Sequence, residues 1–173
     1  MEDPRPSLEL LLRYPPRERF FGWIAYSLSR AERRPTPEDE WVLFDLDQPH
    51  SLTILGSYKF NRNITLGGRF RLISGDPYTP IERGVYDADF DFYAPVFGAE
   101  NSDRLPLFHQ LDLRIDKTYR KDTWSLALYF EVTNVYNNRS VEFDASYNFD
   151  FSQTQFQRVG LPILPVLGLE GKF

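Results

Sequence analysis

The chain has 173 residues, of which 42% are apolar and 26% charged, and its formal net charge is −5. It contains no cysteine, which excludes disulfides and cysteine-ligated metal sites, and its two histidines, His50 and His109, lie too far apart in sequence to favour a histidine zinc centre. The pI near 5.1 argues against nucleic-acid binding, which needs a basic surface to displace counterions. No apolar run reaches the roughly 20 residues of a transmembrane helix.

Apolar residues alternate with polar ones over most of the chain, and this period of two predicts strands with almost no helix. The predicted strands, in chain order, are Leu8–Tyr14, Phe20–Arg33, Ser51–Phe60, Ile64–Leu72, Leu107–Tyr119, Trp124–Tyr136 and Leu161–Phe173. The weaker alternation in Val141 to Phe156 predicts either an eighth strand or a hairpin extension within a loop. The fold class that follows is an all-β, antiparallel, up-and-down meander of about seven or eight long strands.

Short and long connections alternate strictly between the predicted strands. The short ones are Pro15–Glu18, Asn61–Asn63 and Arg120–Thr123, and the long ones are Arg34–Asp47, Gly75–Leu105 and Asn137–Gly160. An up-and-down sheet then has all its short turns at one end and all its long loops at the other, as outer-membrane barrels do. Strands of about eleven residues, rising roughly 3.3 Å each and tilted near 40°, span about 27 Å, which is close to the thickness such barrels cross.

The two faces of the predicted strands differ in polarity. One face is apolar, with aromatic residues towards the strand ends, and the predicted lipid-facing girdle consists of Tyr58, Phe60, Phe70, Tyr119, Trp124 and Tyr136. The other face is charged, and the predicted lumen-facing residues are Arg69, Arg71, Asp112, Arg114 and Glu131, which could pair with one another or with a partner domain. A soluble sheet packed on one face alternates in the same way, but loop asymmetry and strand length favour the membrane.

The stretch from about Leu8 to Phe173 resembles the C-terminal end of TonB-dependent outer-membrane receptors. The resemblance is carried by the order and spacing of RFFGWIAYSLSRAERR (residues 19–34), HSLTILGSYKF with GGRFRLISGDPYTP (50–80), LPLFHQLDLRIDKTYR (105–120), LYFEVTNVYN (128–137) and GLPILPVLGLEGKF (160–173), ahead of a terminal phenylalanine. It implies a C-terminal signal for the barrel-assembly machinery at Leu167, Leu169, Gly171 and Phe173. It also implies a structural role for Asn134, where the penultimate strand meets its loop.

The same resemblance implies a 22-stranded barrel in the bacterial outer membrane, with an N-terminal plug. Such a receptor imports a scarce nutrient, for example a metal chelate, a vitamin or a glycan, with energy delivered by TonB. Residues 1–173 are then the C-terminal segment of the barrel, without the plug and the N-terminal strands, and TonB is contacted only through the missing N-terminal part. The partners of this segment are outer-membrane lipid and the assembly machinery. An odd number of strands and a start, Met1 to Pro6, without a secretory pattern agree with a fragment.

The longest loop carries Asp87, Asp89 and Asp91 between aromatic residues, a spacing that could hold calcium. An EF-hand loop needs glycine at its sixth position and glutamate at its twelfth, where this chain has Phe92 and Gly98, so we expect a solvated extracellular loop without metal or cofactor. The three long loops together carry 15 Asp and Glu against 5 Lys and Arg, a net charge of −10, which repels anionic ligands.

Two other readings of the pattern remain open. A complete eight-stranded outer-membrane barrel with a structural or adhesive role needs Val141 to Phe156 as its additional strand. A soluble lipocalin-like binding protein needs an apolar interior and a charged exterior. The sequence contains no phosphate loop, catalytic dyad or triad, so we expect no enzymatic activity.

Overall fold

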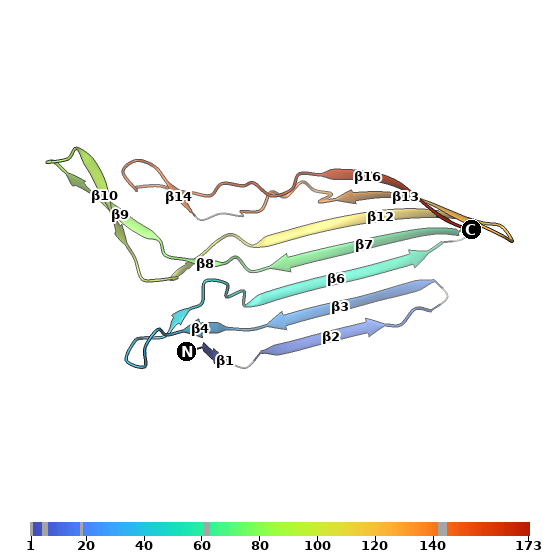
Figure 1. The fold of residues 1–173 in the computed structure, drawn as a ribbon, viewed down its shortest axis with the longest axis horizontal. Helices are drawn as coiled ribbons and strands as arrows, with labels where there is room; N and C mark the ends of the chain where they lie inside the picture. Colours follow the sequence, from blue (N-terminus) through green and yellow to red (C-terminus); the bar gives the residue numbers. More distant parts are fainter. Residues whose placement is uncertain (1, 5–6, 18, 61–62, 142–144) are drawn as a thin grey trace.

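The computed structural model describes residues 2–4, 7–17, 19–60, 63–141 and 145–173. This part of the chain forms strands and loops without an α-helix, and therefore has no helix long and apolar enough to cross a membrane. One large antiparallel sheet contains β2 (Leu8–Tyr14), β3 (Phe20–Leu28), β6 (His50–Lys59), β7 (Ile64–Ile73), β12 (Phe108–Arg120), β13 (Ser125–Thr133) and β16 (Leu164–Lys172) (Figure 1).

The strands of this sheet are hydrogen-bonded in chain order, from β2 at one edge to β16 at the other. The predicted all-β meander is therefore confirmed, with seven strands in its sheet. Short turns join the strands at one end, which we call the turn end, and the long connections gather at the opposite loop end (Figure 1). Glu18, Asn61 and Arg62, which belong to two of the predicted short turns, lie outside the described residues.

Two predicted strands end earlier than the alternation suggested. Phe20–Arg33 leaves the sheet after Leu28, where the Ser29 amide still donates to the carbonyl of Pro49, and its last residues form a separate short strand. Trp124–Tyr136 ends at Thr133 because the next residue, Asn134, has a φ of 55°, which ends extended backbone. Apolar alternation continues past both points, so it could not locate either end.

Short strands at the loop end organise the long connections. They are β1 (Glu2–Pro4), β4 (Ala31–Arg33) and β5 (Val42–Leu43) in one sheet, and β8 (Pro77–Tyr78) with β11 (Asp103–Arg104), β9 (Ile81–Asp87) with β10 (Phe92–Phe97), and β14 (Ser146–Tyr147) with β15 (Thr154–Gln155) as pairs. The described part of Val141 to Phe156 adds no strand to the main sheet: β14 and β15 form a hairpin within a loop, while residues 142–144 lie outside the described residues.

The register places the apolar side chains on one face of the sheet and the charged side chains on the other. On one face, Leu66, Ile115, Phe130 and Leu167 form a continuous row across β7, β12, β13 and β16, and all four are exposed by 43 to 78%. We call this the apolar face. On the opposite, polar face, Asp112 lies directly across from Arg69, and Arg114 lies across from Glu131.

The described residues form no hydrophobic core. Tyr78, at 8% exposed, is the one buried residue among the described Ala, Val, Ile, Leu, Met, Phe, Trp and Tyr. Pro77, next to it, is also buried, and the remaining buried side chains are polar or charged, namely Glu32, Asp47, Ser74, Asn101, Gln110, Asp112, Asn134 and Ser140. The substantial contacts between described elements join hydrogen-bonded neighbours, so the sheet is a single layer with both faces uncovered within the described chain.

One stack on the polar face links the last three strands of the sheet. Gly168 lies opposite Tyr129, and a Cβ added at Gly168 would stand 2.2 Å from the Tyr129 ring. The guanidinium of Arg114 lies 3.9 Å from the centroid of the same ring. Glycine at this position therefore allows the tyrosine ring to lie on the backbone of β16 while it accepts a cation–π contact from β12.

We expect Gly168→Ala to lower the free energy of unfolding by about 1–2 kcal/mol, because the Tyr129 ring must leave its position and lose the Arg114 contact. Urea unfolding of the full chain in detergent micelles, followed by tryptophan fluorescence, measures the change. Gly171→Ala is the matched control, since its added Cβ meets only the end of the Phe173 ring at 3.3 Å. An equal loss in a Tyr129→Ala background would contradict the coupling.

Candidate functional site

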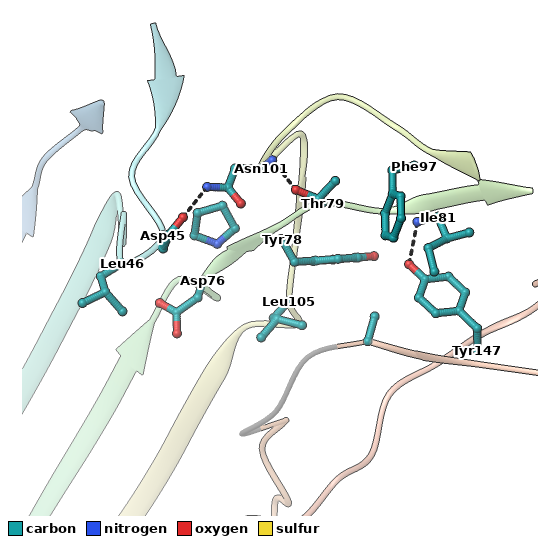
Figure 2. Close-up of a pocket in the computed structure, with 12 residues that line it drawn as sticks. Asp45, Leu46, Asp76, Tyr78, Thr79, Ile81, Phe97, Asn101, Leu105 and Tyr147 are labelled. Atoms are coloured by element: carbon teal, nitrogen blue, oxygen red, sulfur yellow. Dashed lines mark hydrogen bonds between the residues drawn. The ribbon is translucent and has the colours of Figure 1, made fainter. Parts of the chain in front are cut away.

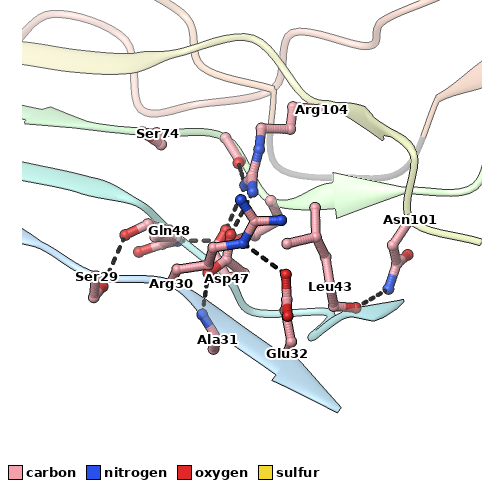
Figure 3. A network of polar contacts seen from close by, with 12 residues as sticks. Ser29, Arg30, Ala31, Glu32, Leu43, Asp47, Gln48, Ser74, Asn101 and Arg104 are labelled. Atoms are coloured by element: carbon pink, nitrogen blue, oxygen red, sulfur yellow. Dashed lines mark hydrogen bonds and ion pairs between the residues drawn. The ribbon is translucent and has the colours of Figure 1, made fainter. Parts of the chain in front are cut away.

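A buried ion pair joins two of the long connections at the loop end (Figure 3). Asp47 is 1% exposed, and its carboxylate accepts hydrogen bonds from the Ala31 amide at 2.5 Å and from the Arg104 guanidinium. Arg104 also donates to the carbonyl oxygens of Asp47, at 2.6 Å, and Gly75, at 3.2 Å. A buried carboxylate requires this kind of pairing, so the pair holds the loop before β6 against the loop before β12.

Asn101 makes a second link between the same loops. Its side-chain amide donates to the carbonyl of Leu43 at 2.8 Å and to the Asp45 carboxylate at 2.7 Å, and its backbone amide donates to Thr79 Oγ1 at 3.0 Å. Asp45 also pairs with Arg33 at 3.0 Å. Asn101 has a φ of 53°, a conformation that asparagine tolerates better than most residues.

A third buried node lies where the polar face meets the loop end. Asp112, 5% exposed, accepts from Arg69 Nη2 at 2.8 Å, from Gln110 Nε2 at 2.6 Å and from the Asn134 amide at 3.0 Å. The Asn134 side chain, 1% exposed, donates to the carbonyls of Asn138 and Leu161 and accepts from the Asn138 amide. Asn134 therefore ties the end of β13 to the last long loop, which is a structural role.

The residues predicted to face a lumen share the polar face, and most of them pair with one another. Arg69 pairs with Asp112, and Arg114 contacts Asp116 at 2.7 Å and Glu131 at 3.5 Å. Arg71 lies over the Phe108 ring, 5.6 Å from its centroid. A depression of about 320 Å³ is lined by two cations, Arg69 and Arg114, and three carboxylates, Asp112, Asp116 and Glu131.

The predicted aromatic girdle residues occupy both ends of the strands. Tyr58, Phe60, Tyr119 and Trp124 lie at the turn end with exposures of 38 to 47%. Tyr136 follows β13 at the loop end, where its hydroxyl is 2.8 Å from His109 Nδ1, and Phe70 lies within β7, three residues from the end of that strand. Tyr26 and His50 form a similar 2.8 Å pair at the loop end.

The residues of the implied assembly signal lie on one face of the edge strand β16 and just after it. Leu167, Leu169 and Phe173 are 78%, 68% and 104% exposed, and Gly171 lies opposite Leu126. On its other side, β16 has no hydrogen-bonded neighbour among the described residues.

Asp87, Asp89 and Asp91 lie at the tip of the β9–β10 hairpin, and two of them stabilise the turn. Asp87 Oδ1 accepts from the amides of Asp89 at 3.0 Å and Phe90 at 3.3 Å, and Asp91 accepts from the Tyr86 hydroxyl at 2.7 Å. Over the described ranges, no group of three or more His, Cys, Asp or Glu side chains is arranged to hold a metal ion.

A cavity of about 670 Å³ opens among the loops (Figure 2). Tyr78 lies in its wall and donates a hydrogen bond to Asp103 Oδ2 at 3.0 Å. Burial and then the neighbouring Asp103 carboxylate raise the pKa of Tyr78 to about 12. The hydroxyl of Tyr147 accepts from the Ile81 amide at 2.9 Å, so both tyrosine rings are held in place by hydrogen bonds.

The sequence reasoning placed the polar face but missed the loop sites. Asp47, Asn101, Arg104 and Tyr78 come from connections without periodicity, and 57 positions separate Asp47 from Arg104. The Asp103-Arg104 pair flanked by Asn101 was visible in the sequence, but nothing indicated its partner in another loop.

Comparison with protein-family models, curated proteins and solved structures found no match for this chain.

We expect Asp103→Asn to lower the pKa of Tyr78 from about 12, but not to its ordinary value near 10, because burial is the larger cause of the shift. The raised pKa means that the folded protein holds this proton more tightly than the unfolded chain. The stability that Tyr78 contributes is therefore complete below about pH 10 and is lost as the pH rises through about 12.

The absorbance of ionised tyrosine is measured across a pH titration of the wild type and of Tyr78→Phe. The difference between the two titrations gives the ionisation of Tyr78. If the tyrosine that disappears in this difference ionises near pH 10, the burial and hydrogen bonding of Tyr78 are not as described.

Proposed function

We propose that this chain forms part of the wall of a transmembrane β-barrel in the bacterial outer membrane, as the C-terminal segment of an active-import receptor. The observation that carries the proposal is the single-layer sheet, whose apolar face is exposed while only Pro77 and Tyr78 among the described apolar side chains are buried. In this proposal, hydrocarbon covers the apolar face, and the polar face with Arg69, Asp112 and Arg114 lines the interior.

The energetics of the apolar face support a lipid environment. Covering a large apolar side chain is worth about 1.5–3 kcal/mol, and the row from Leu66 to Leu167 is only one of several rows on this face. A soluble sheet needs a second layer on that face, and the described residues supply none. The lipocalin-like alternative also needs the apolar residues packed inside, whereas here the large side chains of the apolar face are exposed.

Strand dimensions and the position of aromatic residues agree with a bilayer. β6 and β7 have 10 residues each. At roughly 3.3 Å per residue and a tilt near 40°, such strands span about 25 Å, the height of the apolar band in outer-membrane barrels. At the turn end, six aromatic residues form a belt of the kind found at membrane interfaces, namely Tyr14, Phe20, Tyr58, Phe60, Tyr119 and Trp124.

The directions of the edge strands support a wall segment rather than a closed barrel. β2 pairs its first residue with Leu28 at the loop end, and β16 pairs its first residue with Thr133 at the loop end, so both strands run towards the turn end. Joining these edges directly would make a parallel contact. Antiparallel closure, the arrangement of outer-membrane barrels, therefore takes an odd number of additional strands.

The proposed partners follow from this architecture. Outer-membrane lipid contacts the apolar face, and the barrel-assembly machinery recognises the exposed edge strand β16 with its terminal Phe173. In this proposal, TonB acts on the N-terminal part of the receptor and not on residues 1–173. The import role rests on the resemblance to TonB-dependent receptors, and it is supported by two cavities of ligand size at the loop end, of about 670 and 620 Å³.

Single cysteines on neighbouring residues of β13 test which face meets lipid, because the natural chain has no cysteine. We expect a fluorophore on Leu128→Cys, from the apolar face, to emit at shorter wavelength and to be quenched by brominated lipids in vesicles. The matched variant Ala127→Cys, from the polar face, should respond instead to a water-soluble quencher. Equal responses at both positions would overturn the proposed membrane orientation.

An arginine in the middle of the apolar face provides an energetic test. We expect Ile115→Arg to cost about 2–4 kcal/mol of stability in lipid vesicles, because the cation must enter hydrocarbon. Ala127→Arg is the control, since it adds the same side chain to the polar face opposite Glu170 and should change stability little. Guanidinium unfolding in vesicles measures both, and an equal cost for the two variants would count against lipid on the apolar face.

A further inference from the structure

The cavity among the loops has the dimensions of a small-molecule site. Its volume of about 670 Å³ is within the usual range of ligand pockets, about 300–1,000 Å³. It is built from two of the long connections that the Asp47–Arg104 pair and Asn101 hold together, with Tyr147 from the third. Partly buried hydrogen bonds therefore hold its walls in place.

The two ends of the cavity differ in chemistry (Figure 2). Asp45 and Asp76 lie at one end, while Phe97 and Tyr147 lie at the other, with the ring of Tyr78 between them. Among the described residues that line the cavity, none is lysine, arginine or histidine. The cavity thus has an anionic end and an aromatic end.

Asp76 is the carboxylate whose charge is available to a ligand. Its described hydrogen-bond donor is the neutral side-chain amide of Gln48, at 2.9 Å, and a carboxylate can accept several further bonds. Asp45, in contrast, is already paired with Arg33 at 3.0 Å and bonded to Asn101 at 2.7 Å. Asp45 is therefore held in position, and Asp76 supplies the uncompensated negative charge.

Two of the three rings at the aromatic end are held in position by hydrogen bonds. The hydroxyl of Tyr78 is held by Asp103 and that of Tyr147 by the Ile81 amide, while Phe97 is 62% exposed. Aromatic faces attract both apolar groups and cations. The long loops around the cavity carry a net charge of −10, which raises the local concentration of cations and lowers that of anions.

We propose that this cavity binds a cationic small molecule, with an ammonium or amidinium group at Asp76 and an apolar or aromatic body against Tyr78, Phe97 and Tyr147. The inference deepens the proposed function and rests on it, because it names the substrate class of the import receptor. The cationic group donates hydrogen bonds to the Asp76 carboxylate, which are stronger than those of a neutral donor. The aromatic body fills the remainder of the cavity.

Three probes of nearly the same shape and different charge test this inference: benzamidinium, benzamide and benzoate. Calorimetric titration of the full 173-residue chain in detergent micelles measures their affinities. We expect benzamidinium to bind at least about tenfold more tightly than benzamide, benzoate to bind most weakly, and added salt to weaken benzamidinium binding. Equal affinities for benzamidinium and benzamide, or no binding of benzamidinium, would overturn the proposal without any substitution.

Substitutions locate the site. Asp76→Asn keeps an oxygen that can accept from Gln48 but removes the charge, and we expect it to weaken benzamidinium binding about tenfold and benzamide binding little. Asp89→Asn is the matched control, since it removes the same charge from the same loop at the hairpin tip, away from the cavity lining. We expect it to leave the affinity within about twofold. Equal losses in the two variants would show a general effect of loop charge and refute the site.

Failure of the proposed cation site can be distinguished from failure of the proposed membrane orientation. If Leu128→Cys meets lipid and benzamidinium does not bind, the cation site is wrong and the barrel wall stands. If benzamidinium binds as described and both cysteine positions respond alike, the site stands and its role in import falls.

Discussion

The apolar face of the seven-stranded sheet is the constraint on which the rest of this protein depends. Backbone hydrogen bonds satisfy the strands, but a single layer leaves its apolar side chains without protein contacts within the described chain. In water this exposure costs free energy in proportion to the area, whereas in hydrocarbon it costs nothing. The proposed orientation in the outer membrane, with a wet polar face, follows from placing lipid on that side.

Most of the buried side chains in the described part of the chain are polar or charged, which reverses the usual distribution. Asp47, Asp112, Asn101 and Asn134 are buried, and each has several hydrogen-bond partners. Burying a polar side chain is costly unless its hydrogen-bonding atoms have partners. Each of these side chains is therefore held in one arrangement by its hydrogen bonds. These buried residues hold the long connections in place at the loop end. The cavity between those connections therefore keeps its anionic end and its aromatic end apart.

Local pattern was a good guide to the sheet because strand residues report their face directly, through alternation with a period of two. It was a poor guide to strand ends. Phe20–Arg33 and Trp124–Tyr136 continue to alternate beyond Leu28 and Thr133, where a switch of hydrogen-bond partner and the positive φ of Asn134 end the strands. The weak alternation of Val141 to Phe156 likewise belongs partly to the small β14–β15 hairpin, because a short hairpin in a loop alternates as a sheet strand does.

The sequence by itself determined the seven strands, their order, the ends at which turns and loops lie, and the residues on each face, because all of these depend on neighbours along the chain. Only the tertiary structure decided which charges meet across strands and which loop residues meet at all. Arg69 with Asp112, Arg104 with Asp47, and Asp45 with Asn101 join positions 43 to 57 residues apart. These pairings depend on the register of the sheet and the paths of the loops, and no local pattern records either.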